Sequence, residues 1–273
     1  MSKKLPESEW DKVAEWWNAG VGDIGAWHQQ NDIDPFFFKI FGNLKNKKII
    51  EIGCGNGYFS RFLAKRGARV MAIDLSAKLL AFASAREKAR PLCIKYLVRD
   101  AANLYGLKSK TYDIAIANMS LMDIADTENA IKEVSRVLKR GGRFIFSILH
   151  PSFCNFGQQW VIIKEGGKKY LARAVGQYSS STAKKQNLWS SGVKSTHYHR
   201  SIETYFRYLR NANFLISDFK EITTKKPVTK ARKEDSDVKF RRSKYMTLKE
   251  KKMKEFAVKE IPMFLIIGAL KFE

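Results

Sequence analysis

The chain has 273 residues, of which 45% are hydrophobic, so it can bury a sizeable core in one elaborated domain or two. Fifty Lys and Arg residues against 27 Asp and Glu give a formal net charge of +23. That balance suits a nucleic acid, an anionic membrane surface or an acidic substrate, or else a lysine-rich solvated surface. Three cysteines without a CxxC pair argue against a disulfide framework and a cysteine-based zinc site, and we expect no metal. The N-terminus is polar and the apolar run at 262–270 is too short for a membrane span, so we expect a soluble, cytoplasmic protein.

The first half of the chain changes character near residue 48. Residues 5–47 are expected to be helical, with an aromatic stripe that includes Trp10, Trp17 and Trp27. Short apolar runs then alternate with helical periodicity, which predicts βαβ units and a parallel sheet with right-handed crossovers. The expected strands are 48–52, 69–73, 94–98, 112–117 and 143–148, and the expected helices are 58–66, 77–89 and 127–138. Gly141-Gly142 is expected to cap the last of these helices.

The alternation stops after His150. A hairpin is predicted from 159–163 and 170–174, around Glu165-Gly166-Gly167. Helical periodicity returns at 201–211, and strands are expected at 214–222 and 263–270. The segment 225–260 between them is a long basic insertion to which the pattern assigns no structure.

Residues 49–57, Ile-Ile-Glu-Ile-Gly-Cys-Gly-Asn-Gly, carry most of the functional information. A β-branched run, an acid and three alternating glycines precede a helix, which predicts a strand, a tight turn and a helix N-terminus. Such a turn brings a ligand against bare backbone, because glycine allows positive φ and has no Cβ to block close approach.

Two acids follow at the ends of the next predicted strands. Asp74 lies about twenty residues beyond the glycines, where a carboxylate can accept both hydroxyls of an adenosine ribose. It could instead cap the following helix, a role that Ser76 could also fill. Asp100 ends the third strand, where it could take an adenine amino group or be an ordinary loop aspartate.

These motifs resemble those of the class I S-adenosylmethionine-dependent methyltransferases. Glu51-x-Gly53-x-Gly55-x-Gly57 is similar to the family's first motif, and 137–144, Val-Leu-Lys-Arg-Gly-Gly-Arg-Phe, is similar to the segment leading into its fifth strand. A dinucleotide-binding protein usually shows GxGxxG, so NAD is the minor alternative. The resemblance implies an α/β, doubly wound, Rossmann-like sheet of seven strands in the order 3-2-1-4-5-7-6 with the last strand antiparallel. It implies S-adenosylmethionine as cofactor, S-adenosylhomocysteine as product, and the following cofactor-binding residues: Glu51, Gly53, Cys54, Gly55, Asn56, Gly57, Asp74, Leu75, Asp100, Ala101, Asn118 and Met119.

The methyl acceptor is read from the segments outside these motifs. The resemblance favours an O or N atom of a small molecule, with residues 1–47 as a helical lid, 48–273 as the methyltransferase domain, and 151–200 as a substrate-cap insertion. His150, in Ser147-Ile-Leu-His-Pro, and His199 are the expected catalytic residues, although His150 could simply fix the turn at Pro151. The expected substrate contacts are Trp27, His28, His150 and Arg200.

Two other functions stay open. The +23 charge and the basic insertion 225–260 suit a tRNA or rRNA methyltransferase, but the Asn118-Met119-Ser120 motif lacks the Pro-Pro form of adenine-amino methyltransferases. A non-catalytic adenosine-binding protein on the same fold is the third possibility. We expect a monomer or a homodimer.

Overall fold

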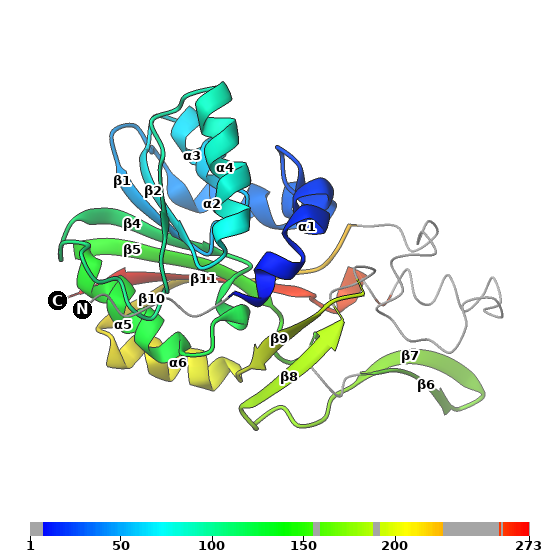
Figure 1. Ribbon diagram of the computed structural model, residues 1–273. Coiled ribbons are helices and arrows are strands. Elements are labelled where there is room, and N and C mark those ends of the chain that lie inside the picture. Colours follow the sequence, from blue (N-terminus) through cyan, green and yellow to red (C-terminus); the bar gives the residue numbers. More distant parts are fainter. Residues whose placement is uncertain (1–7, 155–158, 188–191, 226–256, 258, 273) are drawn as a thin grey trace.

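The computed structural model describes residues 8–154, 159–187, 192–225, 257 and 259–272, which build around one central sheet (Figure 1). Its seven strands run in the order β10-β11-β5-β4-β1-β2-β3. Their bounds are β1 Lys48–Ile52, β2 Arg69–Asp74, β3 Lys95–Val98, β4 Tyr112–Asn118, β5 Leu138–Leu149, β10 Phe214–Ile222 and β11 Phe264–Lys271. The first five are parallel, and β11 is antiparallel to both β5 and β10. The predicted order 3-2-1-4-5-7-6 is therefore confirmed, because β11 and β10 are the seventh and sixth strands of the sheet.

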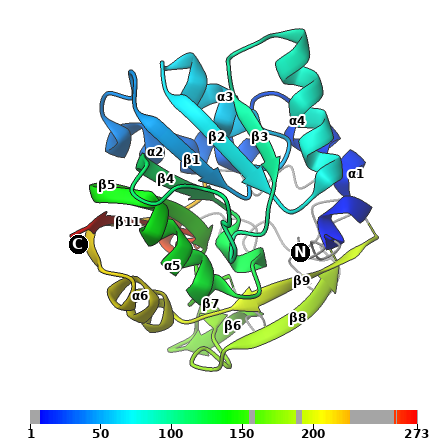
Figure 2. The ribbon, with the colours of Figure 1, turned by 60° about the vertical axis from the view of Figure 1, so that its left-hand side comes forward.

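Helices cover both faces of the sheet (Figures 1 and 2). Alternate residues of β1 show why: Ile49 packs into a core with Phe37 and Phe59, while Ile50 packs into the other core with Val134. The first face carries α2 Asp34–Phe41, α3 Tyr58–Lys65 and α4 Ala77–Ala89, and the second carries α5 Thr127–Val137 and α6 Ile202–Asn211. The aromatic N-terminal region thus contributes to the first of these two cores, through Phe37 and Phe41 of α2.

The expected helix cap at Gly141-Gly142 is wrong. Helix α5 ends at Val137, and Leu138 already has extended backbone at φ −73° and ψ 144°. Leu138 pairs with Tyr112 and Arg143 pairs with Ile114, so the residues between them form a bulged stretch inside β5. Gly141 has φ +71° there, so its left-handed backbone belongs to the bulge in the strand and not to a helix end.

Short elements at the carboxyl ends of the parallel strands form what we call the roof: residues 8–34 and 159–199. Its N-terminal part holds η1 Glu9–Lys12, α1 Ala14–Val21 and η2 Gln29–Ile33. Its second part holds two hairpins, β6 Gln159–Glu165 with β7 Lys168–Ala174, and β8 Thr182–Asn187 with β9 Lys194–His199. The first hairpin confirms the prediction, and it extends away from the sheet in Figure 1. The second was not anticipated, and most of the basic insertion, 226–256, lies outside the described residues.

Candidate cofactor and acceptor site

The glycine loop joins β1 to α3 with three residues in the left-handed region. Gly53, Gly55 and Gly57 have φ values of +65°, +55° and +77°. A Cβ on Gly53 would lie 2.5 Å from the Ser120 Cβ, and one on Gly57 would lie 2.6 Å from the Tyr96 hydroxyl oxygen. A Cβ on Gly55 would meet only the Trp17 indole nitrogen, at 3.6 Å. Two of the glycines are therefore enforced by packing, and the third presents bare backbone beneath α1.

Asp74 holds this loop through both carboxylate oxygens. Oδ2 accepts the Gly55 amide N–H at 2.7 Å, and Oδ1 accepts the Ser76 N–H at 2.8 Å. Burial raises the pKa of Asp74 to about 6, against the lowering effect of these two N–H donors. Ser76, whose hydroxyl accepts the Leu79 N–H, is the N-cap of α4, so the alternative that Asp74 caps this helix is not what the structure has.

Asp100 and Ala101 lie beside this position, at the end of the neighbouring strand. Asp74 pairs with Val98 across β2 and β3, and Asp100 follows two residues later. Its Oδ1 accepts the Ala102 N–H at 2.9 Å, while Ala101 is buried and Leu75 is half-buried. The structure thus brings Asp74, Leu75, Asp100 and Ala101 to one end of the sheet.

The floor of the site holds two buried carboxyl groups. Glu51 is 2% exposed and accepts a hydrogen bond from the Ser60 hydroxyl, and burial raises its pKa to about 8. Asp34, at the start of α2, accepts from the Asn118 amide at 3.1 Å and from the Tyr58 hydroxyl at 3.4 Å. Burial raises the pKa of Asp34 to about 7. Sequence reasoning missed Asp34, because no motif connects this acid before Pro35 to the distant strand β4.

Asn118 and Met119 end β4 in an unusual conformation. Met119 has φ +57°, and its N–H donates to the Ser147 carbonyl at 3.1 Å and to the Ser147 hydroxyl at 2.9 Å. That hydroxyl donates in turn to the Asn118 Oδ1 at 2.7 Å. A non-glycine residue at positive φ costs free energy and is held here by β5, an arrangement that is common at functional sites.

Two other predicted cofactor residues turn away from the open side of the loop. Cys54 is 5% exposed and belongs to the core beside α2 and α3. Asn56 is 1% exposed, and its amide donates to the Asn18 Oδ1 at 3.1 Å and to the Gly22 carbonyl at 3.0 Å. Asn56 therefore ties the N-terminal helix α1 to the loop.

His150 follows β5 at the same edge, with both ring nitrogens engaged. Its Nδ1 accepts the Ser152 N–H at 3.2 Å, and its Nε2 lies 2.9 Å from Glu221 Oε1. Burial lowers the pKa of His150, although Glu221 works in the other direction. The structure thus contains the turn-fixing contact that the sequence left open, beside the carboxylate of β10.

His199 and Arg200 join the second roof hairpin to the sheet. The His199 Nε2 lies 2.7 Å from the Tyr178 carbonyl oxygen, and burial lowers the pKa of this histidine. Arg200 donates to the carbonyls of Ile124 and Ala125 at 3.0 and 2.6 Å, in the loop after β4. Both side chains fasten the roof over the site in this structure.

The N-terminal roof residues reach the site from the opposite side. Trp27 is 37% exposed, and its ring contacts His28 edge-on at 5.2 Å between centroids. The His28 ring also lies 5.4 Å from that of Phe264, at the start of β11, and its Nδ1 is 2.8 Å from Asp32. Of the predicted substrate contacts, Trp27 and His28 lie on the β11 side and Arg200 on the side of the loop after β4.

Two sets of contacts in the roof were not predicted. The His197 Nδ1 in β9 lies 2.9 Å from the Asp123 Oδ1 in η3 Leu121–Asp123. Glu9 accepts the Thr196 N–H at 2.7 Å, while Asp11 accepts the Ser76 hydroxyl at 2.5 Å. The segment η1 therefore bridges β9 and the start of α4, and it closes the roof above Asp74.

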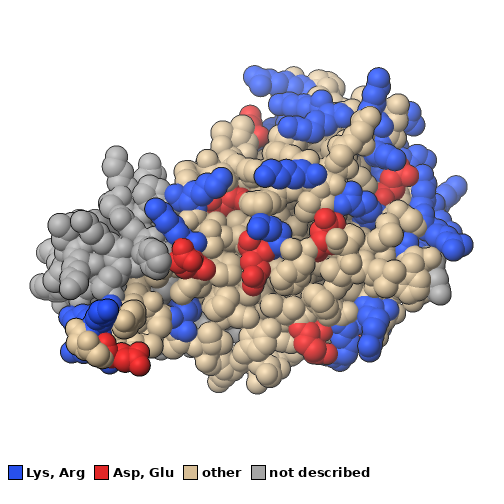
Figure 3. Space-filling view, turned by 180° about the vertical axis from the view of Figure 1, so that it is seen from behind, with Lys and Arg blue, Asp and Glu red and all other residues tan. Residues whose placement is uncertain are grey.

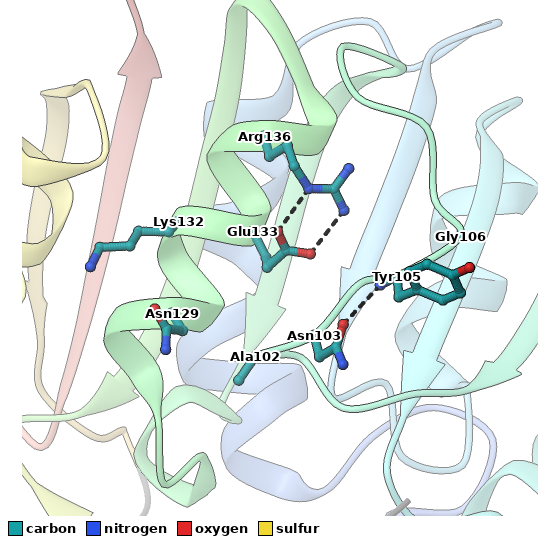
Figure 4. A pocket seen from close by; sticks show the side chains of 8 residues that line it. All are labelled: Ala102, Asn103, Tyr105, Gly106, Asn129, Lys132, Glu133 and Arg136. Atoms are coloured by element: carbon teal, nitrogen blue, oxygen red, sulfur yellow. Dashed lines mark hydrogen bonds and ion pairs between the residues drawn. The ribbon is translucent and has the colours of Figure 1, made fainter. Parts of the chain in front are cut away.

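A separate hollow of about 370 Å³ lies between the loop 102–106 and α5 (Figure 4). Its Arg136 makes two hydrogen bonds to Glu133, at 2.7 and 2.8 Å, and also donates to the carbonyls of Leu104 and Leu107. The hollow does not include the glycine loop or Asp74, and its Arg136 is committed to these structural contacts.

The described residues contain neither a candidate metal-binding cluster nor a candidate membrane-spanning helix. No group of three or more His, Cys, Asp or Glu side chains in that part of the chain could hold a metal ion. None of the helices built from those residues has the length and apolar character to cross a membrane.

The comparisons with known proteins agree with this fold. Residues 50–146 match the family described as a methyltransferase domain. A ubiquinone biosynthesis O-methyltransferase from Hydrogenovibrio crunogenus is 30% identical over 141 residues, which are 52% of this chain and 58% of that protein. One from Coxiella burnetii is 26% identical over 196 residues, 69% of this chain and 83% of that protein. The crystal structure of an S-adenosylmethionine-dependent methyltransferase from Mesorhizobium loti has a TM-score of 0.64 at 24% identity, and the match covers 86% of this chain and 96% of that one.

Residues 50–146 therefore carry a methyltransferase domain. The relatives and the fold support a class I S-adenosylmethionine-dependent methyltransferase. The chain spans 58% of the length of the Hydrogenovibrio relative and 83% of the Coxiella one.

Proposed function

We propose that this enzyme transfers the methyl group of S-adenosylmethionine to an oxygen atom of a small molecule. The observation that carries the proposal is the glycine loop, whose Gly55 backbone lies bare beneath α1 while Asp74 holds its N–H at 2.7 Å. The names of the curated relatives, which are O-methyltransferases, support the oxygen acceptor.

The residues at the sheet edge fit this cofactor. A nucleoside needs close backbone approach, which the three glycines allow, and an acid for its ribose, which Asp74 supplies. Asp100 and Ala101, which follow the end of the neighbouring strand β3 at Val98, are proposed to contact the adenine. The cofactor's ammonium and sulfonium are cationic, and their binding would favour the ionised forms of Glu51 and Asp34, whose raised pKa values leave both groups largely or partly protonated near neutral pH without cofactor.

The transfer itself makes modest demands on the protein. When bound, the cofactor supplies a methyl group already activated on a sulfonium. The chain must align the acceptor oxygen with that methyl and exclude water, and alignment contributes several kcal/mol of the barrier, about 7–11 in favourable cases. Asn118 and the strained Met119 lie at the end of β4, where we place the methyl end of the cofactor.

The roof is proposed as the acceptor-binding part, with residues 1–47 as a lid and 151–200 as a cap on the domain 48–273. Trp27, His28, His150 and Arg200 are its proposed substrate contacts, and His150 and His199 stay predictions as catalytic residues. A cytoplasmic location also stays a prediction, based on the free cysteines Cys54, Cys93 and Cys154. Whether the enzyme is a monomer or a homodimer belongs to the same set of predictions.

The RNA alternative is not favoured. The curated relatives carry small-molecule O-methyltransferase names. On the face of the molecule in Figure 3, Lys and Arg side chains are spread over much of the surface with Asp and Glu side chains among them. That distribution suits a solvated basic surface better than a single phosphate-binding track.

The test is incubation with methyl-labelled S-adenosylmethionine and a fractionated cell extract. We expect label in a low-mass product and no label in RNA or protein. Treatment of that product with base should release labelled methanol only if the product is a methyl ester. Asp74→Ala is the matched loss-of-function variant. Label found only in RNA, together with RNA binding that weakens steeply with salt, would replace the proposal with the RNA alternative. Calorimetry that shows no cofactor binding would instead favour the non-catalytic protein.

A further inference from the structure

The N-terminal roof contains a histidine, His28, with a buried carboxylate beside one of its ring nitrogens, which is the usual arrangement of a catalytic proton acceptor. His28 Nδ1 lies 2.8 Å from Asp32 Oδ2, one helical turn further along the chain. The Asp32 side chain is fully buried, and the His28 side chain is 32% exposed. A buried carboxylate at Nδ1 fixes the proton on that nitrogen and places the lone pair on Nε2.

Asp32 is itself held by a third element. Its Oδ2 accepts the Thr224 hydroxyl at 2.8 Å, and its Oδ1 accepts the Lys225 backbone N–H at 3.0 Å. Both partners follow β10, far from Asp32 in the chain. Base, orienting acid and a support for the acid form the arrangement that activates a nucleophile in unrelated enzymes.

The other histidines are held differently. His150 and His199 are 1% and 7% exposed, and each has its Nε2 within 2.9 Å of an oxygen of the protein. His197 is 9% exposed. For the Nε2 of His28, no hydrogen-bond partner lies among the residues that the structure describes. His28 is therefore the histidine whose second nitrogen is open to a small molecule.

His28 also stands at the correct edge. Its ring packs at 5.4 Å against Phe264, which pairs with Leu149 at the carboxyl end of β5. Asp34, six residues further along the same helical run, contacts Asn118 at the end of β4. The titratable and charged groups around His28 are Asp32 and Asp34 on its own run, Lys225 after β10, and the His150–Glu221 pair at the ends of β5 and β10.

We propose that His28 is the general base for the methyl acceptor, that Asp32 is its positioning residue, and that the acceptor is a hydroxyl group, such as a phenol. In the transfer, the O–H bond breaks and its proton moves to His28 Nε2. The oxygen forms the C–O bond, and the electrons of the broken S–CH₃ bond stay on sulfur. The resulting imidazolium is stabilised by the Asp32 carboxylate. A carboxylate acceptor would be ionised already and would need no base, so the dyad itself selects a hydroxyl. This inference rests on the proposed O-methyltransferase function.

The experiment has an arm that needs no acceptor. The full-length wild-type protein is treated with diethyl pyrocarbonate, with and without S-adenosylhomocysteine, and the modified histidines are mapped by peptide mass spectrometry. We expect His28 to react first among the four histidines. Reaction at His150, His197 or His199 ahead of His28 overturns the inference, whatever the enzyme methylates.

The second arm uses the low-mass extract fraction that the wild-type enzyme labels. His28→Ala should lower kcat by about 100-fold or more, because general-base catalysis contributes roughly 10²–10⁴-fold. The KM for S-adenosylmethionine should change little, and added imidazole should restore part of the lost rate. Asp32→Asn should also lower kcat, while Glu203→Gln, at an exposed position of α6 outside the roof, should leave the rate unchanged.

The outcomes separate the two proposals. If the wild-type enzyme labels no low-mass compound, the proposed function fails and this inference falls with it. If it does label one, a full rate in His28→Ala, a loss without imidazole rescue, or a product that is a carboxylic ester each overturns the dyad while the methyltransferase function stands.

Discussion

The two sides of the proposed site are built by different means. At the cofactor edge, formed by the ends of β1, β2 and β4, geometry is set by main chain: positive-φ glycines, strand register and N–H groups held by Asp74. In the roof, geometry is set by long-range side-chain contacts, such as Glu9 with Thr196 and His197 with Asp123. The first arrangement is proposed to bind the cofactor, and the second, built largely from loops and short elements, can differ with the acceptor. Substitutions should therefore have larger and more uniform effects at the edge than in the roof.

The largest effect is expected within the glycine loop, where the three glycines are not equivalent. Gly53→Val combines φ +65° with a Cβ placed 2.5 Å from Ser120, and strain plus overpacking cost about 2–5 kcal/mol. We expect a thermal midpoint lower by several degrees and no cofactor binding. Gly55→Val has the strain of φ +55°, about 1–2 kcal/mol, but meets nothing closer than Trp17 at 3.6 Å, so it should lose cofactor binding with a smaller drop in the thermal midpoint than Gly53→Val.

Thermal melts and calorimetry on the two variants check this contrast. Gly20→Ala is the control, because it lies inside α1 with open space around it and should gain about 0.5–1 kcal/mol in stability. Equal melting temperatures for the Gly53 and Gly55 variants would contradict the packing difference described here.

The next effect concerns the ribose position. Asp74→Ala removes the acceptor of the Gly55 and Ser76 N–H groups, and hydrogen bonds to charged groups contribute about 1.5–3 kcal/mol each. We expect cofactor affinity to fall by about 10-fold or more in calorimetry. The control is Asp113→Ala, since Asp113 also accepts a backbone N–H, that of Lys48 at 2.8 Å, but at the opposite end of the strands. A similar loss of affinity in both variants would mean that Asp74 acts on the sheet as a whole.

The buried carboxyls predict a third, smaller effect, on stability against pH. Burial raises the pKa of Asp34 from 3.8 to about 7 and that of Glu51 from 4.5 to about 8. Between the ordinary and the raised pKa the folded state binds more protons than the unfolded state, so the free energy of unfolding falls as pH rises. Without cofactor, the thermal midpoint should therefore drop from pH 5 to pH 8, by roughly 2 °C or more per kcal/mol.

Glu51→Gln separates this cause from a general charge effect. It removes the proton linkage of Glu51, so its midpoint should vary less with pH than that of the wild type. The Glu128→Gln change, at a partly exposed residue paired with Lys132 on α5, should leave the pH dependence of the wild-type midpoint unchanged. A wild-type midpoint that rises steadily over this range would show that Glu51 and Asp34 are ionised in the folded protein.

The cofactor edge was predictable from the sequence because its signals are local. Alternating apolar runs located strands such as β1 and β10 to the residue, and the Gly53–Gly57 spacing located the loop. Gly141-Gly142 misled because glycine pairs serve strand bulges as well as helix ends. Asp34, His197 with Asp123, and Asp32 with Thr224 could not be found this way, since each depends on tertiary packing between segments with no spacing rule. Strand β8, rich in Thr, Lys and Gln, lacks the apolar alternation that would have predicted its hairpin.

The smallest effect is expected at the clamp between η1 and β9. The Glu9 carboxylate accepts the Thr196 N–H at 2.7 Å and lies 3.5 Å from the Lys185 Nζ, at a partly exposed position. Burial works to raise the pKa of Glu9, but the bond from the Thr196 N–H and the Lys185 contacts lower it overall, so the carboxylate is ionised at neutral pH. Glu9→Ala should loosen the roof without touching the glycine loop. Because a partly exposed contact of this kind contributes only about 1 kcal/mol, the KM for the acceptor should rise by a few-fold while cofactor affinity stays at the wild-type value.

Calorimetry with S-adenosylhomocysteine and initial rates on the labelled acceptor measure the two quantities separately. The neighbouring Glu15→Ala, on the exposed side of α1, should change neither quantity. An equal weakening of cofactor and acceptor binding in Glu9→Ala would show that roof and cofactor edge act as a single unit, which is the outcome that the present comparison forbids.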